Sequence, residues 1–239
     1  MLEECLKKVC LVATGKTVGA LREAALSAPT KWVELRLDTL ANPATPTVKE
    51  GVKSLVRELR VAGKEVILTL RDVSEGGHFS GDVREKVALL TELASASPTL
   101  VDVELKSPAY PEVVEALKRS GVGVLASTHH LSKPLSRDAL TRLARYALAS
   151  GASMFKAVFP AEGLNDNLIA LEACAAWGGK VVSFCLGKVG RVSRLLAPFF
   201  GAPFTYAFPD GGTPVAEGQL SVGEILKLWD ALGVVKGCG

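Results

Sequence analysis

One lysine, Lys156, stands inside an otherwise apolar run that extends from Met154 to Pro160. Lysine is rarely buried without a function or a partner. Burial penalises the ammonium and lowers the pKa of an amine; a pKa moved from about 10.4 toward 7–8 raises the neutral fraction at pH 7 by roughly two to three orders of magnitude. We expect nearby arginines to act in the same direction. Lys156 is therefore a candidate nucleophile that forms an imine with a ketone. The alternative is a lysine whose ammonium reaches solvent at the rim of the fold.

Ionisable residues also alternate with apolar residues in other short runs. The apolar members are Val33, Leu35 and Leu37 in one run, Val66, Leu68 and Leu70 in the next, and Val101, Val103 and Leu105 in a third; the polar members are Glu34, Arg36, Asp38, Thr69, Arg71, Asp102 and Glu104. Alternation places the polar side chains on one face of each strand. Burying so many charges is costly unless they pair or serve chemistry. A structural ion-pair network is the alternative to a catalytic site.

Eight β-rich runs can carry these residues. They are 8–13, 32–38, 66–71, 100–105, 122–128, 153–159, 180–186 and 203–208. Helical periodicity lies between or after them at 48–62, 83–96, 111–120, 137–150, 165–177 and 221–232. Glycines follow several of these helices, as expected at the position after a C-cap: Gly63, Gly121, Gly151 and Gly178.

The alternation of strands and helices predicts an α/β fold with parallel strands. Eight units at intervals of about 25–30 residues favour a (β/α)8 TIM barrel, which residues 1–239 would fill as one catalytic domain. An open doubly wound sheet is the alternative, but the turn Gly15-Lys16-Thr17 lacks the upstream glycine of a phosphate loop, since Cys10 stands there. In a barrel, the polar strand faces point into the interior, toward the catalytic end.

Composition excludes several classes of function. The hydrophobic share is 48%, the charged share 22% and the net charge +3, which is typical of a globular protein and too low for a nucleic-acid-binding groove. No run is long and apolar enough to span a membrane. The five cysteines form no Cys-x-x-Cys pair, which indicates reduced thiols in a cytoplasmic protein. Only three histidines occur, without metal-ligand spacing, so we expect no metal.

The motifs resemble the type I 3-dehydroquinate dehydratase family, in the same order from Glu34 to Gln219. The matching pieces are Glu34–Asp38, Thr69–Arg71 followed by Glu75-Gly76-Gly77, Asp102–Leu105, Ser127-Thr128-His129, Phe155–Val158, Gly187–Gly190 with Ser193-Arg194, and Gly218-Gln219. The resemblance implies a lyase of the shikimate pathway that converts 3-dehydroquinate to 3-dehydroshikimate in aromatic amino-acid biosynthesis. It implies a homodimer and no cofactor.

The resemblance also implies roles for particular residues. Lys156 would form the Schiff base, His129 would act as general acid and base, and Glu75 would orient that histidine. Arg194 would bind the substrate carboxylate. Further contacts to the ring hydroxyls are expected from Glu34, Arg36, Arg71 and Gln219, although Arg36 is as well suited to be a structural partner of Glu34 or Asp38. Asp102 and Glu104 fit a structural network at least as well as a pocket.

The sequence departs from the family pattern at two places. His130-Leu131 follows His129 where the family usually has Asp-Phe. Neighbouring residues at a strand end point to opposite sides, so one histidine alone can enter the pocket, and the alignment favours His129. Val215 stands where the family has a serine in a substrate-closing loop, with Thr213 nearby. His78 is expected in an exposed loop.

Two other functions are compatible with parts of this pattern. A class I aldolase acting on a small keto substrate, with or without a phosphate group, would also use an imine lysine on the sixth strand; Arg194 as a carboxylate-binding residue favours the dehydratase. A barrel that only binds a ligand or a partner subunit would not need the set of Lys156, His129 and Glu75.

Overall fold

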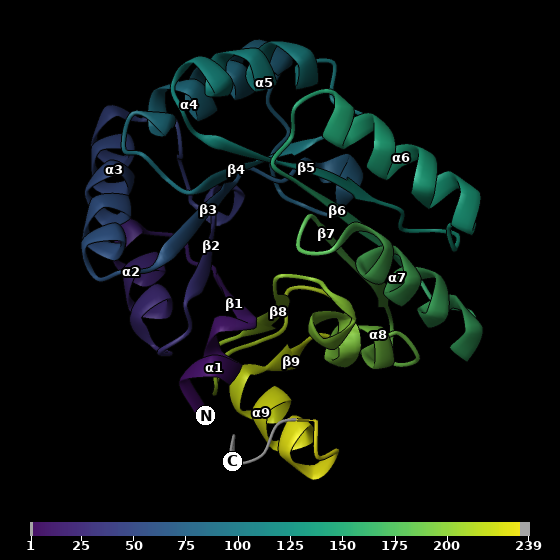
Figure 1. Ribbon diagram of the computed structural model, residues 1–239. Coiled ribbons are helices and arrows are strands. Elements are labelled where there is room, and N and C mark those ends of the chain that lie inside the picture. The colour runs from purple at the N-terminus through teal and green to yellow at the C-terminus, as the bar shows by residue number, and fades with distance from the viewer. Residues whose placement is uncertain (1, 235–239) are drawn as a thin grey trace.

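The computed structural model describes residues 2–234, and its strands form one curled parallel sheet surrounded by helices (Figure 1). The strands are β1 (Val9–Ala13), β2 (Trp32–Arg36), β3 (Glu65–Thr69), β4 (Leu100–Glu104), β5 (Gly123–His129), β6 (Met154–Pro160), β7 (Val181–Leu186), β8 (Thr205–Phe208) and β9 (Leu220–Ser221). Eight of them correspond to the predicted runs. The TIM-barrel fold is confirmed.

The helices connect successive strands on the outside of the sheet. They are α1 (Leu2–Lys7), α2 (Val18–Leu26), α3 (Pro46–Val61), α4 (Val83–Ala94), α5 (Tyr110–Arg119), α6 (Arg137–Ala149), α7 (Leu164–Trp177), α8 (Arg191–Leu196) and α9 (Val222–Ala231), with 3₁₀ turns η1 (Leu37–Thr39), η2 (Val73–Glu75) and η3 (Ala197–Phe200). Local sequence sets several of their ends. Asp82 and Glu85 form a capping box on α4, and Ser221 and Glu224 form one on α9.

The order of the strands is β7-β6-β5-β4-β3-β2-β1-β8-β9. Every pairing is parallel. In the described part of the chain β7 and β8 share no ladder of hydrogen bonds, so the barrel is open at this seam. Aromatic rings cross the seam instead: the rings of Phe184 on β7 and Tyr206 on β8 lie 5.9 Å apart between centroids.

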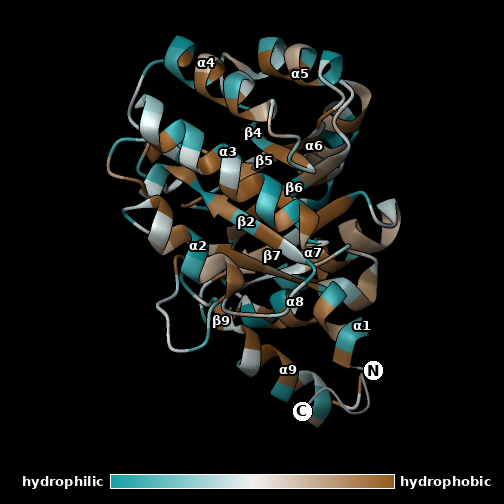
Figure 2. Cartoon of the chain, turned by 90° about the vertical axis from the view of Figure 1, so that its left-hand side faces the viewer, coloured by the Kyte–Doolittle hydropathy of each residue, from teal (hydrophilic) through white to brown (hydrophobic). Residues whose placement is uncertain are grey.

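Two apolar layers follow from the alternation of the strands. The outer layer joins strand residues such as Val33, Leu35 and Phe155 to the helices, as predicted. The inner layer consists of strand residues, among them Val12, Val158, Phe184 and Tyr206, together with Phe204, which directly precedes β8. Figure 2 shows brown, apolar segments in the strands, which lie inside a ring of helices that carry both teal and brown segments. The polar residues on the inner strand faces therefore lie inside the barrel.

The cysteines differ in part from the expectation of reduced thiols. Cys10, Cys174 and Cys185 are free and buried. Cys5, on α1, is disulfide-bonded, so the expectation is wrong for this residue. Cys238 lies outside the described residues. Across residues 2–234, none of the helices has both the length and the apolar character needed to cross a membrane.

Candidate active site

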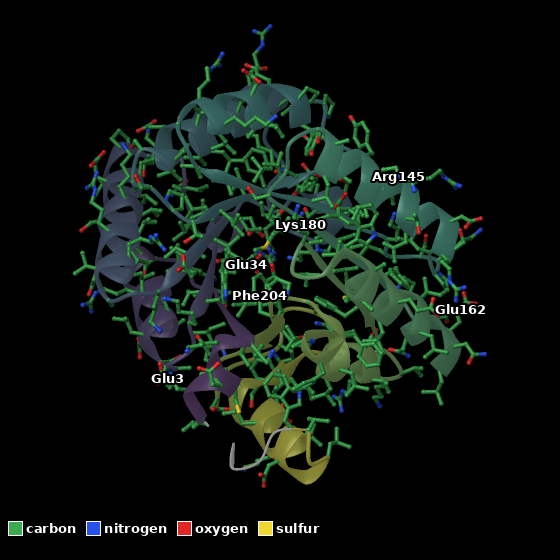
Figure 3. All side chains as sticks on the ribbon, in the orientation of Figure 1. Glu3, Glu34, Arg145, Glu162, Lys180 and Phe204 are labelled. Atoms are coloured by element: carbon green, nitrogen blue, oxygen red, sulfur yellow. The ribbon has the colours of Figure 1, made fainter. Side chains whose placement is uncertain are left out.

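Lys156 lies on β6 with its side chain inside the barrel, only 5% exposed. Its Nζ is 3.4 Å from Glu34 Oε1 and 3.6 Å from Asp102 Oδ2. The same atom lies 4.1 Å from the centroid of the Tyr206 ring. Burial is as predicted, but the nearest charged groups are carboxylates rather than arginines. Figure 3 shows Glu34 inside the ring of strands, whereas Glu3, Arg145 and Glu162 lie on the periphery.

A cavity of about 250 Å³ opens beside Lys156. Eight of its lining residues are those that the sequence predicted for the site: Glu34, Arg36, Arg71, Glu75, His129, Lys156, Arg194 and Gln219. They come from β2, β5 and β6, from the segments that follow β3, from α8 and from the loop before β9. The barrel brings together residues up to 185 positions apart in the chain (219 − 34).

His129 ends β5 and is paired with Glu75, on the η2 turn after β3. Both the backbone N and the Nδ1 of His129 lie 2.9 Å from Glu75 Oε2. Because Nδ1 is held by the carboxylate, Nε2 is the ring nitrogen left for a ligand. His130 does not line this cavity; its backbone N donates to Val158 O, and its Nε2 is buried without a partner in the described structure.

Burial dominates the electrostatics of this pair. It lowers the pKa of His129 well below 6.5, and the positive charge of Arg71 and Lys156 acts in the same direction. Burial also raises the pKa of Glu75 to about 7; Arg71 opposes this change, while the negative charge of Glu104 reinforces it. His129 is thus held neutral at pH 7, as a general base requires.

Arg71 is the centre of a buried ion network. Its Nη2 lies 2.6 Å from Asp102 Oδ2, and its Nη1 lies 3.0 Å from Glu104 Oε1 and 3.6 Å from Glu75 Oε2. Nη1 also donates to Ser127 Oγ at 2.8 Å. Asp102 and Glu104 do not line the cavity and belong to this ion network, and Asp102 also lies 3.6 Å from Lys156 Nζ.

Arg36 has a carboxylate partner of its own. Its Nε and Nη2 donate to the two oxygens of Asp38 at 2.9 and 2.7 Å, a bidentate arrangement. Asp38 also accepts a hydrogen bond from the backbone N of His78, whose side chain is 70% exposed, as expected. Arg36 is therefore both a structural partner of Asp38 and part of the cavity wall.

Arg194, on α8, is buried without a carboxylate. Its guanidinium carbon lies 4.3 Å from the centroid of the Phe184 ring, and its Nε has no hydrogen-bond partner within residues 2–234. No described acidic side chain lies within 4.0 Å of it. Burial without such a partner lowers the pKa of Arg194 to about 10, so the group stays charged at neutral pH. This cation is available to an anionic ligand in the cavity.

Gln219 lies at the end of the loop between β8 and β9. Its Oε1 accepts from the backbone N of Val215 at 2.9 Å, so the main chain of residue 215 holds the loop where the family has a serine. Gly218 adopts a φ of +79°, and a Cβ at this position would lie 2.2 Å from Gly187 O. The glycine permits the close approach of this loop to the β7–α8 loop.

Sequence reasoning missed three residues that complete the site. Tyr206 presents its ring to Lys156, Ser127 links Arg71 to Asp102, and Phe184 stacks on Arg194. Phe204 and Tyr206 are two positions apart in the predicted eighth strand and therefore share one face of it. The alternation of this strand could have predicted that Tyr206 points inward. Ser127 belongs to the motif Ser127-Thr128-His129, but the sequence indicated no role for it, and no motif pointed to Phe184.

Comparisons with known proteins give a consistent result. A family model described as Type I 3-dehydroquinase matches residues 9–236. A 3-dehydroquinate dehydratase of Methanosarcina barkeri is 33% identical over 208 residues, covering 84% of each chain. The Methanothermobacter thermautotrophicus enzyme of the same name is 32% identical over 224 residues, covering 92% of this chain and 95% of its own. The solved type I 3-dehydroquinate dehydratase of Clostridium difficile, covalently modified by comenic acid, superposes with a TM-score of 0.81 at 24% identity over 95% of this chain and 92% of its own.

Proposed function

This chain belongs to the type I 3-dehydroquinase family, and we propose that it dehydrates 3-dehydroquinate to 3-dehydroshikimate through an imine on Lys156. The observation that carries the proposal is the shared cavity: a buried amine and a neutral histidine held by a carboxylate line the same 250 Å³ space. An amine supplies the electron sink, and an imidazole moves the proton. The class I aldolase alternative is not favoured by the family match.

The reaction balances with the groups present. The ammonium of Lys156 gives up a proton, and its Nζ attacks the C3 ketone; two protons of the ammonium then leave with the C3 oxygen as water, which gives a protonated imine. His129 Nε2 then takes a proton from C2, and the electron pair of the C–H bond flows to the imine nitrogen to form an enamine. The enamine expels the C1 hydroxyl, which takes the proton from His129 and leaves as water. Hydrolysis of the imine returns the amine and releases 3-dehydroshikimate.

Other residues of the cavity would bind the substrate. Arg194 is suited to the carboxylate, because it is a buried cation with no described acidic partner. Glu34, Arg36 and Gln219 present polar atoms to the ring hydroxyls. Arg71 has its donors engaged by Asp102, Glu104 and Ser127, so we assign it to shaping the pocket.

Trapping of the imine tests the proposal. Borohydride added during turnover of 3-dehydroquinate is expected to attach ligand mass to Lys156, measured by peptide mass spectrometry, and Lys156→Ala is expected to abolish both the adduct and the absorbance of the enone product. His129→Ala should slow turnover yet permit some adduct. Lys180→Ala and His130→Ala are the matched controls and should retain both signals. An adduct on another lysine rejects the assignment.

We also infer that residues 1–239 form one catalytic domain, that the protein is a cytoplasmic homodimer, and that it needs neither metal nor organic cofactor. The biosynthetic function supports the cytoplasm; the cysteines do not decide the compartment, since Cys10, Cys174 and Cys185 are free whereas Cys5 is disulfide-bonded. Support for a dimer comes from α7, where Leu164 and Leu168, one turn apart, are 69% and 53% exposed. EDTA is expected to leave turnover unchanged.

A further inference from the structure

A second buried lysine, Lys86, lies behind the candidate active site. It belongs to α4, is 3% exposed, and does not line the cavity that contains Lys156. Its Nζ lies 2.5 Å from Glu104 Oε2, and the ring of Phe79 covers it at 5.6 Å. A lysine buried to this degree requires a charged partner. Glu104 is that partner.

The contacts of Glu104 lead from Lys86 to the histidine. The other carboxylate oxygen of Glu104, Oε1, lies 3.0 Å from Arg71 Nη1. Arg71 Nη1 is 3.6 Å from Glu75 Oε2, the atom that holds His129 Nδ1 at 2.9 Å. The order of contacts is therefore Lys86, Glu104, Arg71, Glu75 and His129. Each member except His129 is at most 4% exposed, so water screens these charges little.

A second cavity places Lys86 on the far side of Glu75. This cavity of about 140 Å³ is lined by Glu75, Glu104 and Lys86 together, whereas the catalytic cavity includes Glu75 and not the other two. Glu75 thus forms part of the wall between the two spaces. A change of charge at Lys86 or Glu104 acts on Glu75 from behind, without touching a bound substrate.

The charge balance explains why a second cation is needed. One guanidinium, that of Arg71, lies near three carboxylates: Asp102, Glu104 and Glu75. Without Lys86, Arg71 would be the one remaining described cation within 4.0 Å of Glu104, and Glu104 would draw the Arg71 guanidinium away from Glu75. The added negative charge would favour protonation of Glu75, and a protonated carboxyl is a poorer acceptor for the imidazole N–H.

We propose that Lys86 is a positioning residue for proton transfer: by compensating the charge of Glu104, it allows Arg71, which contacts both carboxylates, to keep Glu75 ionised against His129. The proposal rests on the proposed function of His129. It assigns a role in the reaction to a helix residue that never meets the substrate.

Several other charged groups surround Glu75 and are part of the same balance. They come from the segment after β3, from β4 and its following loop, from β5, from β6 and from α4: Arg71, Asp72, Asp102, Glu104, Lys106, His129, Lys156, Asp82 and Lys86. Lys86→Met removes one of these charges and keeps an unbranched side chain that is one atom shorter. The Lys86→Met/Glu104→Gln double variant removes both charges and restores the balance.

The test compares pH profiles of kcat/KM for the wild-type protein and four variants. Lys86→Met is expected to move the acidic limb to higher pH by about one unit and to lower kcat more than it changes KM. Lys86→Arg and the double variant should return the limb to within about 0.3 units of its original position. Lys53→Met is the matched control, because Lys53 is also a largely buried lysine, paired with Glu50 on α3 and Glu92 on α4 and without a contact to Glu75 or Glu104. It should leave the limb in place. An unmoved limb in folded Lys86→Met overturns the proposal.

A substrate-free measurement separates this proposal from the function itself. The pKa of His129 can be followed by NMR titration of its ring protons, since the chain has only three histidines. Lys86→Met should raise it, and the double variant should reverse the change. Turnover absent from the wild-type protein rejects the proposed function, while a His129 pKa that is the same in wild type and Lys86→Met rejects the role of Lys86. If Lys86→Met does not fold, the titrations of Lys86→Arg and of the double variant decide. A His129 pKa in the double variant that differs from the wild-type pKa contradicts the proposal. A His129 pKa that equals the wild-type pKa in both variants supports it.

Discussion

Glu75 and His129 behave as one acid–base unit, and their burial sets the pH at which it works. Burial raises the pKa of Glu75 to about 7 and lowers the pKa of His129 well below 6.5. The form suited to abstracting a proton has Glu75 ionised and His129 neutral. Glu75, rather than the histidine, is the group that takes up a proton first as the pH falls from 8.

This order predicts the shape of the pH profile. The kcat/KM for 3-dehydroquinate should fall as the pH drops through about 7, because Glu75 becomes protonated there. Glu75→Gln should remove that limb and lower kcat by about 10–100-fold, since the ring loses its charged orienting partner. Steady-state rates between pH 5 and 9 check both effects. A limb retained in Glu75→Gln would show that another group controls it.

The candidate site could be predicted from the sequence at the level of residue identity. Alternation in short strands was sufficient to point Glu34, Arg71 and Lys156 inward, and all eight predicted residues line one cavity. The partners of these residues were not predictable in the same way. The neighbours of Nζ depend on which strands face each other across the barrel, and that information lies in the packing rather than in spacing along the chain.

At the scale of elements, the turn after β3 decides where Glu75 stands. The backbone N of Gly77 donates to Asp72 O at 2.9 Å, which closes the turn that contains Glu75. A Cβ on Gly77 would lie 2.1 Å from Arg71 O and 2.5 Å from Arg71 Cγ. At these distances the Cβ would overlap with the backbone of Arg71, so the turn that contains Gly77 would have to move.

Gly77→Ala is therefore expected to impair catalysis and stability together. Displacing the turn separates Glu75 from His129 and disturbs Arg71, so kcat should fall at least 10-fold and the free energy of unfolding by about 2 kcal/mol. Rates and urea unfolding measure the two effects. Gly121→Ala is a suitable control for the backbone, because that glycine has positive φ but open space around it; it should lower stability alone.

Elements were predicted where their pattern was long and punctuated. The helices α3, α6 and α7 were expected from their periodicity and lie within two residues of the predicted bounds. α1, α2 and α8 were not predicted. α1 and α8 have six residues each and α2 has nine, too few for apolar periodicity to stand out. α8 nevertheless carries Arg194, so a short helix supplied a site residue that motif order alone identified.

At the scale of the molecule, the exposed side of α7 bears on assembly. Ala170, Leu171 and Cys174 face the barrel, while Leu164 and Leu168 face outward. If this face joins two copies, light scattering should give twice the mass of the chain, and Leu168→Glu should shift the protein toward monomer without changing the fold by circular dichroism. Leu131→Glu, at an exposed leucine outside α7, is the control for assembly. A wild-type monomer contradicts the dimer.

The unpartnered guanidinium of Arg194 has a practical consequence for handling the protein. A buried guanidinium with no acidic partner within 4.0 Å among residues 2–234 attracts whichever small carboxylate the solution offers. Acetate, citrate or malonate in a purification buffer would bind where we propose that the substrate carboxylate binds, raise the melting temperature and compete in assays. An apparent substrate affinity measured in such a buffer would then report the replacement of the buffer carboxylate by the substrate and would be lower than the true affinity.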